Sequence, residues 1–108
     1  MMNSRQWDTT LTFSDNEKVL VRGTQSPGGR IDVIYPSGQD FVAADAGDYV
    51  YPSDVRIDVR NDLLYVKCDG LAIFRRETWL FEYDLVHQQL LKRQRVVPGV
   101  LPAECPVQ

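Results

Sequence analysis

The segment Asp62–Val97, DLLYVKCDGLAIFRRETWLFEYDLVHQQLLKRQRVV, decides the fold class of this 108-residue chain. Apolar residues recur at every second position in several short stretches, which are separated by turn-forming residues. A period of two is typical of half-buried β-strands, and short strands joined by tight turns form an antiparallel meander. The segment therefore predicts an all-β fold, and it contains no nucleophile motif, metal-ligand cluster or phosphate-binding loop.

One face of this segment is aromatic. In the predicted strand Thr78–Leu85, the alternate positions Trp79, Phe81, Tyr83 and Leu85 share a face, opposite more polar residues. Each buried aromatic side chain removes roughly 150–250 Å² from water. We therefore expect these four residues to form the centre of the core.

The same alternation extends to the rest of the chain. It predicts strands at Trp7–Phe13, Glu17–Arg22, Arg30–Tyr35, Asp40–Ala44, Val55–Arg60, Leu63–Cys68, Leu71–Arg76 and Thr78–Leu85. Asn61-Asp62 and Asp69-Gly70 are predicted as tight turns, because these residue types tolerate the positive φ that hairpin turns require. We predict a single domain over residues 1–108, an antiparallel β-sandwich or twisted meander of about seven or eight short strands.

The segment Asp84–Val97 fits two interpretations. Asp84 is a good helix N-cap and Pro98-Gly99 would end a helix, so one short helix near residues 85–95 is possible on sequence grounds. The other interpretation is a turn followed by a strand at Leu90–Val97. We favour the strand because YDLVHQQLLKRQRV resembles the last hairpin of a β-propeller blade, although the chain is too short for a complete propeller. The proline-rich tail at 98–108 is expected to be extended.

Composition places the chain among ordinary globular proteins. It is 44% hydrophobic and 25% charged, and its formal net charge is −3. No apolar run approaches the roughly 20 residues that cross a bilayer, and the N-terminus does not resemble a signal peptide, so we expect a cytoplasmic protein without a membrane segment. Cys68 and Cys105 match no zinc or redox spacing and are interpreted as free thiols, with a disulfide between them as the alternative.

The acidic residues are unevenly distributed. Between Ile31 and Val55 there are five Asp residues and no Lys or Arg, and the stretch DAGDYVYPSD is predicted to be a surface loop. Tyrosines supply rigid contact area and acidic groups steer a basic partner, so this segment is the candidate partner-binding site. The residues assigned to it are Asp40, Asp45, Asp48, Tyr49, Tyr51 and Asp54.

Catalysis and cofactor binding find little support in the sequence. His87 is the sole histidine, and no Ser, Thr or Cys lies in a recognised nucleophile motif. We therefore expect no catalytic residue, no metal and no cofactor. The basic residues Arg75, Arg76, Lys92, Arg93 and Arg95 are explained by cross-strand ion pairs, and a pI near 5.0 argues against nucleic-acid binding.

These observations favour a non-enzymatic protein-binding module that docks its acidic loop on a basic partner. A small, acidic β-domain without catalytic motifs resembles in general profile the bacterial immunity proteins and antitoxins that block a basic nuclease toxin. The alternative is a structural or accessory subunit of a larger assembly, related to phages or secretion. A third possibility is a small-ligand binder or enzyme, with a cavity lined by the aromatic face and reached by His87 or the Asp cluster.

Overall fold

The protein consists of two antiparallel four-stranded sheets. The computed structural model describes residues 6–13, 16–24, 30–47, 50–72 and 75–96. Sheet A contains β1 (Gln6–Phe13), β2 (Glu17–Thr24), β3 (Ile31–Ile34) and β4 (Asp40–Ala44), and sheet B contains β5 (Val50–Arg60), β6 (Leu63–Ala72), β7 (Arg75–Asp84) and β8 (Gln89–Val96). This confirms the predicted all-β fold.

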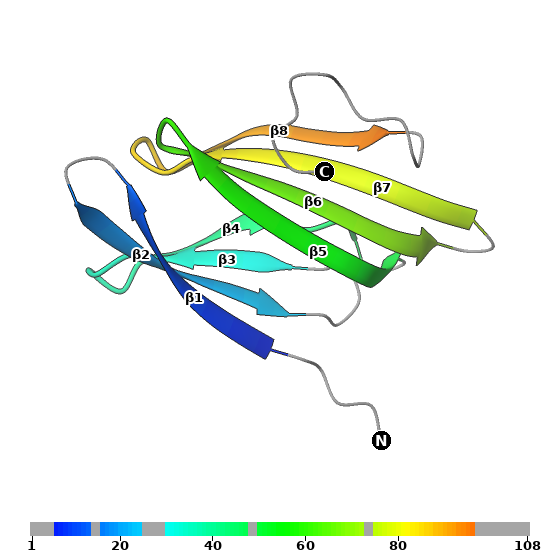
Figure 1. Ribbon diagram of the computed structural model, residues 1–108, viewed down its shortest axis with the longest axis horizontal. Helices are drawn as coiled ribbons and strands as arrows, with labels where there is room; N and C mark the ends of the chain where they lie inside the picture. The colour runs from blue at the N-terminus through cyan, green and yellow to red at the C-terminus, as the bar shows by residue number, and fades with distance from the viewer. Residues whose placement is uncertain (1–5, 14–15, 25–29, 48–49, 73–74, 97–108) are drawn as a thin grey trace.

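Both sheets are simple meanders in which every strand pairs with its neighbours in sequence. The chain passes from one sheet to the other only once, between β4 and β5. Figure 1 shows sheet B lying across sheet A, with β6 and β7 extending beyond the ends of β2 and β3. In the described part of the chain no helix is present, and so none that could cross a membrane.

The alternation in sequence becomes two apolar inner faces. Over residues 63–70 of β6 the even-numbered residues are buried and the odd-numbered ones are partly buried. The register places Tyr83, Phe81 and Trp79 of β7 opposite Leu64, Val66 and Cys68, so these odd-numbered residues of β7 share the inner face. One core therefore joins the two sheets. Its buried members are Phe13, Val19, Val21, Ile31, Val33, Tyr35, Ala43, Ala44, Ala46, Val50, Leu64, Val66, Cys68, Phe81, Tyr83 and Leu85.

A polar contact inside this core ties the sheets together. The hydroxyl of Tyr35, which follows β3, donates a hydrogen bond to the backbone carbonyl of Leu85, which follows β7, at 2.6 Å. The rings of Phe13 and Phe41 pack edge-on against Tyr35, with centroids 6.4 and 5.7 Å away. The Tyr83 hydroxyl is buried beside that of Tyr35 and has no hydrogen-bond partner of good geometry. Burial raises the pKa of both tyrosines, so both stay neutral at physiological pH.

Trp7 needs a glycine opposite it. Trp7 is half-buried on the inner face of β1 and pairs with Gly23 of β2. A Cβ atom at Gly23 would overlap the indole ring. Gly23 is therefore required for close packing of a large ring on the neighbouring backbone, and not for an unusual φ.

The two predicted hairpin turns have different outcomes. Asn61 and Asp62 form the turn between β5 and β6 with φ of 51° and 65°, as predicted. Asp69-Gly70 was expected to be a turn, and this prediction is wrong, because β6 runs through it to Ala72. A Cβ at Gly70 would lie 2.8 Å from the Tyr51 carbonyl oxygen, where β5 bulges between Pro52 and Asp54. Gly70 thus allows close approach of the β5 backbone.

The same bulge corrects the prediction of a long acidic loop. The stretch at 45–54 was expected to be a surface loop, but β5 begins at Val50 and includes Tyr51, Pro52 and Asp54. The bulge absorbs the residue that would otherwise disturb the inward and outward alternation of the strand. Only 45–47 is irregular among the described residues of this stretch.

The final segment is a hairpin, and the alternative of a short helix near 85–95 is wrong. Residues 85–88 form a turn, in which Gln88 has φ of 56°, and β8 then pairs with β7. The Asp84 carboxylate accepts hydrogen bonds from the backbone N–H groups of Val86 and His87, both at 3.0 Å. Asp84 therefore caps a single turn, and not the N-terminus of a helix as the alternative interpretation required.

Cys68 is a free and fully buried thiol of the core. Burial raises its pKa to about 12, and the negative charges of Asp69 and Asp54 contribute in the same direction. Cys105 and the predicted extended tail at 98–108 lie outside the described residues.

We predict that Tyr35→Phe destabilises the protein by about 1–3 kcal/mol, because the buried Leu85 carbonyl loses its hydrogen bond. Tyr83→Phe is the matched control and should cost less than about 1 kcal/mol, since its hydroxyl forms no good hydrogen bond. Urea unfolding monitored by circular dichroism gives both values. Equal losses for the two variants would show that the Tyr35–Leu85 bond is not a main link between the sheets.

We also predict that Cys68 is inert in the folded protein, because only the thiolate reacts and burial disfavours it. In a Cys105→Ser variant, which leaves one thiol, a disulfide reagent such as dithiobis(nitrobenzoate) should react only as fast as the protein unfolds. Adding denaturant should expose the thiol. Rapid labelling under native conditions would contradict the burial of this side chain.

Candidate functional site

The predicted partner-binding residues do not form one patch in the described structure. Asp40 begins β4, whereas Asp45 follows its other end. Tyr51 and Asp54 lie in β5, in the other sheet. Asp48 and Tyr49 lie outside the described residues, so their part of the prediction stays open.

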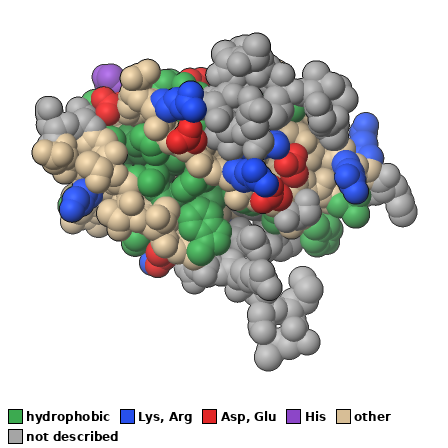
Figure 2. Space-filling model, in the orientation of Figure 1, with side chains coloured by type: hydrophobic (Ala, Val, Ile, Leu, Met, Phe, Trp, Pro, Cys, Tyr) green, Lys and Arg blue, Asp and Glu red, His purple; other side chains and the backbone are tan. Residues whose placement is uncertain are grey.

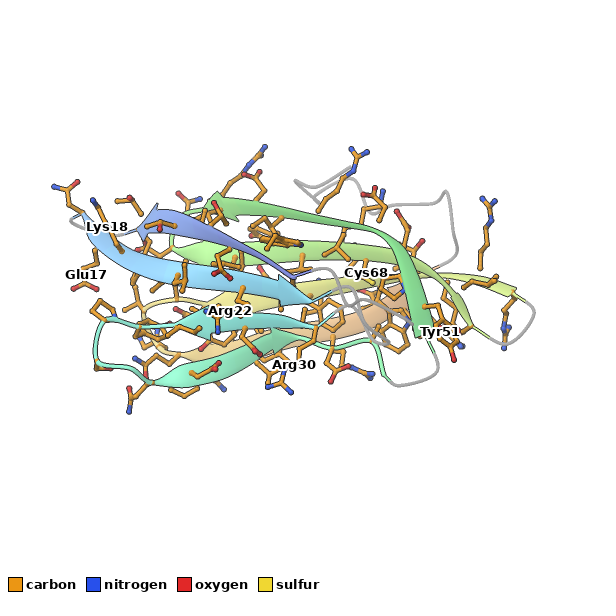
Figure 3. All side chains as sticks on the ribbon, turned by 90° about the horizontal axis from the view of Figure 1, so that it is seen from below. Glu17, Lys18, Arg22, Arg30, Tyr51 and Cys68 are labelled. Atoms are coloured by element: carbon orange, nitrogen blue, oxygen red, sulfur yellow. The ribbon has the colours of Figure 1, made fainter. Side chains whose placement is uncertain are left out.

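Arginines that precede the acidic segment in sequence lie close to its carboxylates in the structure. On the outer face of sheet A, Arg22 pairs with Asp8 at 3.0 Å and Arg30 pairs with Asp32 at 2.8 Å. These partners raise the pKa of each arginine, and Asp40 adds a smaller contribution to both. Arg22 and Arg30 are labelled on sheet A in Figure 3. A region that lacks Lys and Arg in sequence is therefore not free of positive charge in space.

Asp45 shapes the connection between the sheets. Its side-chain Oδ1 accepts a hydrogen bond from the backbone N–H of Gly47 at 2.9 Å, which closes a local turn. Its backbone carbonyl accepts a hydrogen bond from Nε–H of Arg93 in β8 at 3.1 Å. Both contacts give Asp45 a structural role in the connection between the sheets. The residue is nevertheless exposed.

Asp54 belongs to a row of charges on the outer face of sheet B. It lies directly opposite Asp69 of β6, an arrangement of like charges that would be repulsive alone. Arg56 pairs with Asp54 at 2.8 Å, and Lys67 pairs with Asp69 at 3.3 Å. Thr78 also donates a hydrogen bond to Asp69 at 2.5 Å. Figure 2 shows acidic and basic side chains side by side on this face.

Among the predicted partner-binding residues that the structure describes, Tyr51 is the large hydrophobic side chain exposed to solvent. It is 58% exposed and pairs directly with Leu71 of β6, which is 52% exposed. We call these two residues the Tyr51–Leu71 pair. Arg76 of β7 lies next to Leu71 in the same row of the outer face. Figure 3 shows Tyr51 at the end of the molecule opposite Glu17 and Lys18.

A groove occupies the inner face at the same end of sheet B, where the sheet extends past sheet A. Its volume is about 470 Å³, within the range of roughly 300–1,000 Å³ that is usual for ligand sites. We call it the Trp79 groove. It is lined by Ala46, Gly47, Val50, Ala72, Arg75, Glu77, Trp79 and Arg95.

Glu77 organises one wall of the Trp79 groove. Its side chain is only 10% exposed, and it accepts Nε1–H of Trp79 at 3.0 Å and Nη1–H of Arg95 at 3.2 Å. The Arg93 guanidinium lies 4.3 Å from the centre of the Trp79 ring, in a cation–π contact. The Glu77–Arg95 pair confirms the predicted cross-strand ion pairing for Arg95. Arg93 instead contacts the Asp45 carbonyl and the Trp79 ring.

Sequence reasoning placed Trp79 in the core and did not identify the groove. The core assignment holds for Phe81, Tyr83 and Leu85, whereas Trp79 is only half-buried. A signal was present: Glu77 and Trp79 share a strand face, as do Arg93 and Arg95. The register that brings these two pairs together, with Trp79 opposite Arg95, was needed to interpret it.

His87 lies on the exposed turn between β7 and β8 and is not part of the groove lining. Its Nδ1 is 2.8 Å from Oδ2 of Asp84, so the ring is a partner of a turn-capping carboxylate. Within the described ranges, no group of three or more His, Cys, Asp or Glu residues is arranged to hold a metal ion.

Comparisons of the chain with protein-family models, with curated proteins and with solved structures find no match.

We predict that Asp84 makes stability pH-dependent. The His87 backbone N–H, followed by the His87 ring, lowers the pKa of Asp84 from its ordinary 3.8. The carboxylate therefore stabilises the fold above the unfolded pKa, and this contribution is lost as the pH falls through the folded pKa. The difference in unfolding free energy between wild type and Asp84→Asn should be present at neutral pH and shrink below about pH 4.

Urea unfolding at a series of pH values measures this difference. His87→Ala is the informative control: it should retain most of the pH dependence, because the backbone N–H of residue 87 is the larger cause of the shift. A difference between wild type and Asp84→Asn that is constant down to acidic pH would contradict the assignment.

Proposed function

We propose that this protein is a non-enzymatic protein-binding module of the cytoplasm, and that it contacts its partner through the Tyr51–Leu71 pair. The observation that carries the proposal is the exposure of a Tyr and a Leu directly opposite one another at the end of a sheet. Tyrosine is enriched among the residues that dominate binding energy at interfaces. Two neighbouring β-strands fix the pair, so little conformational entropy would be lost on binding.

Charged residues on the same face of sheet B surround the Tyr51–Leu71 pair. Asp54 and Asp69 occupy the next row of the same face, and Arg76 lies beside Leu71. A polar rim around a partly apolar centre is the usual arrangement of an interface. The chain is acidic overall, with a net charge of −3, which favours encounter with a basic partner.

An inhibitor of the immunity or antitoxin type is the more specific form of this proposal. Such a protein blocks the active site of a basic enzyme by binding and needs no chemistry of its own. His87 lies on an exposed turn and is not part of the groove lining, so the proposal assigns it no role in binding. Because the acidic residues are spread over two sheets, we centre the proposed contact on Tyr51 and Asp54, and not on the whole segment 31–55.

Tyr51→Ala and Leu71→Ala should each weaken partner binding at least about tenfold, as expected for central interface residues. Tagged wild type captures the partner from the native host, and the affinities of the purified variants are then measured by surface plasmon resonance. Leu91→Ala is the matched control, since Leu91 is 49% exposed but lies in β8, and it should bind normally.

A separate variant tests whether the negative charge of Asp54 speeds association with the partner. Asp54→Asn should lower the association rate at low ionic strength and reduce the salt dependence of that rate. Unchanged rates would remove Asp54 from the proposal. Full binding by both alanine variants would overturn the Tyr51–Leu71 pair as the contact.

A structural subunit of a larger assembly remains the second candidate. It is favoured by β8, an edge strand of sheet B that exposes Leu90 and Leu91, 40% and 49% accessible. Exposed edge strands are templates for pairing with another chain. A mass that rises with concentration in light scattering, and that Leu91→Lys reduces, would favour this candidate over the inhibitor.

A further inference from the structure

The Trp79 groove lies on the opposite face of sheet B from the Tyr51–Leu71 pair and does not take part in the proposed protein contact. Its lining residues on β5, β6 and β7 lie opposite one another in rows that run across the three paired strands. The outermost row is Val50, Ala72 and Arg75, and Glu77 and Trp79 follow along β7. Ala46 and Gly47, after β4, complete the wall on the side of sheet A.

Among the lining residues that the structure describes, Glu77 is the one carboxylate, and it already accepts two hydrogen bonds. Oε2 of Glu77 accepts the Trp79 indole N–H, and Oε1 accepts a guanidinium N–H of Arg95. A cationic ligand would have to displace these contacts from a side chain that is 10% exposed. Glu77 is therefore a positioning residue for Arg95 and Trp79, and the groove does not favour a cation.

Unsatisfied hydrogen-bond donors are what the groove offers a ligand. Arg95 uses Nη1 for Glu77 and has further N–H groups, since a guanidinium carries five. Arg75 is exposed and forms no ion pair among the residues that the structure describes. In the described lining, Arg75 and Arg95 carry two positive charges against the single negative charge of Glu77, and this excess of positive charge suits an anion.

The remaining lining is apolar. Ala46, Val50 and Ala72 supply aliphatic walls, and Trp79 supplies an aromatic one. A bare inorganic anion would leave these walls without contacts, whereas a carboxylate attached to an apolar group would use both kinds of surface. We propose that the Trp79 groove binds an apolar or aromatic carboxylate, with Arg75 as its main ion-pair partner.

Two ligands share this chemistry: a free aromatic acid and the C-terminal carboxylate of a peptide. N-acetyl-phenylalanine and N-acetyl-phenylalaninamide form a matched pair of probes, because they differ only in the carboxylate. Titration of the full chain is followed by the ¹H–¹⁵N signal of the Trp79 indole N–H. The acid should shift this signal in a saturable manner, and the amide should bind at least about tenfold more weakly. Phenylpropionate then distinguishes the sources, since it lacks the peptide group.

Arg75→Gln should weaken binding of the acid about tenfold or more. Arg76→Gln is the matched control: the next residue of β7 faces the outer side of the sheet, opposite Leu71, and its loss should leave binding unchanged. Equal binding of the acid and the amide, no shift of the Trp79 signal with either probe, or equal effects of the two arginine variants would overturn the proposal.

If Arg75→Gln does not fold, the comparison of the acid with the amide in the wild type still tests whether the groove binds a carboxylate. Because the groove and the Tyr51–Leu71 pair lie on opposite faces, either proposal can fail without the other.

Discussion

One buried hydrogen bond, from the Tyr35 hydroxyl to the Leu85 carbonyl, connects the two sheets inside their common core. An apolar sandwich core is non-directional, because hydrophobic burial alone fixes neither the register nor the angle between two sheets. A buried polar group does impose a direction, since leaving it unpaired is costly. Phe13 and Phe41 hold the Tyr35 ring on two sides, so the hydroxyl is aimed at one carbonyl.

A second connection between the sheets involves the other end of β4. Arg93 donates a hydrogen bond to the backbone carbonyl of Asp45 while its guanidinium covers the Trp79 ring. Residues 45–47 are thereby held against β8 and form one wall of the Trp79 groove. The groove lies where sheet A ends and sheet B continues beyond it, and Ala46 and Gly47 form its wall on the side of sheet A.

Tertiary structure also changes the meaning of the charges. The segment 31–55 contains no Lys or Arg, yet Asp32 and Asp54 pair with Arg30 and Arg56, which flank it in sequence. What distinguishes the far end of sheet B is therefore not uncompensated negative charge. It is an exposed Tyr and Leu on one face, and on the other a groove in which guanidinium groups outnumber carboxylates.

Several features were determined by the sequence alone. Alternation of apolar residues placed Trp79, Phe81, Tyr83 and Leu85 on one face, because the side chains of a strand point to opposite sides whatever the strand pairs with. Asn61-Asp62 predicted its turn because the two polar residues interrupt the alternation and both tolerate positive φ. Asp84 was considered as the N-cap of a helix, whereas the structure shows its carboxylate capping the turn between β7 and β8.

Only the tertiary structure decided the remainder, because it depended on what each strand faces. Asp69-Gly70 has the composition of a turn, but a bulge in β5 requires a residue without a side chain there, and β6 continues. The helix or strand ambiguity near 85–95 was settled by pairing with β7, which is non-local. Trp79 was predicted to be in the core, but it is only half-buried and packs against the core from the lining of the groove. The local pattern fixed which way each side chain points, and the extent of the opposite sheet fixed whether it is buried, paired or available to a ligand.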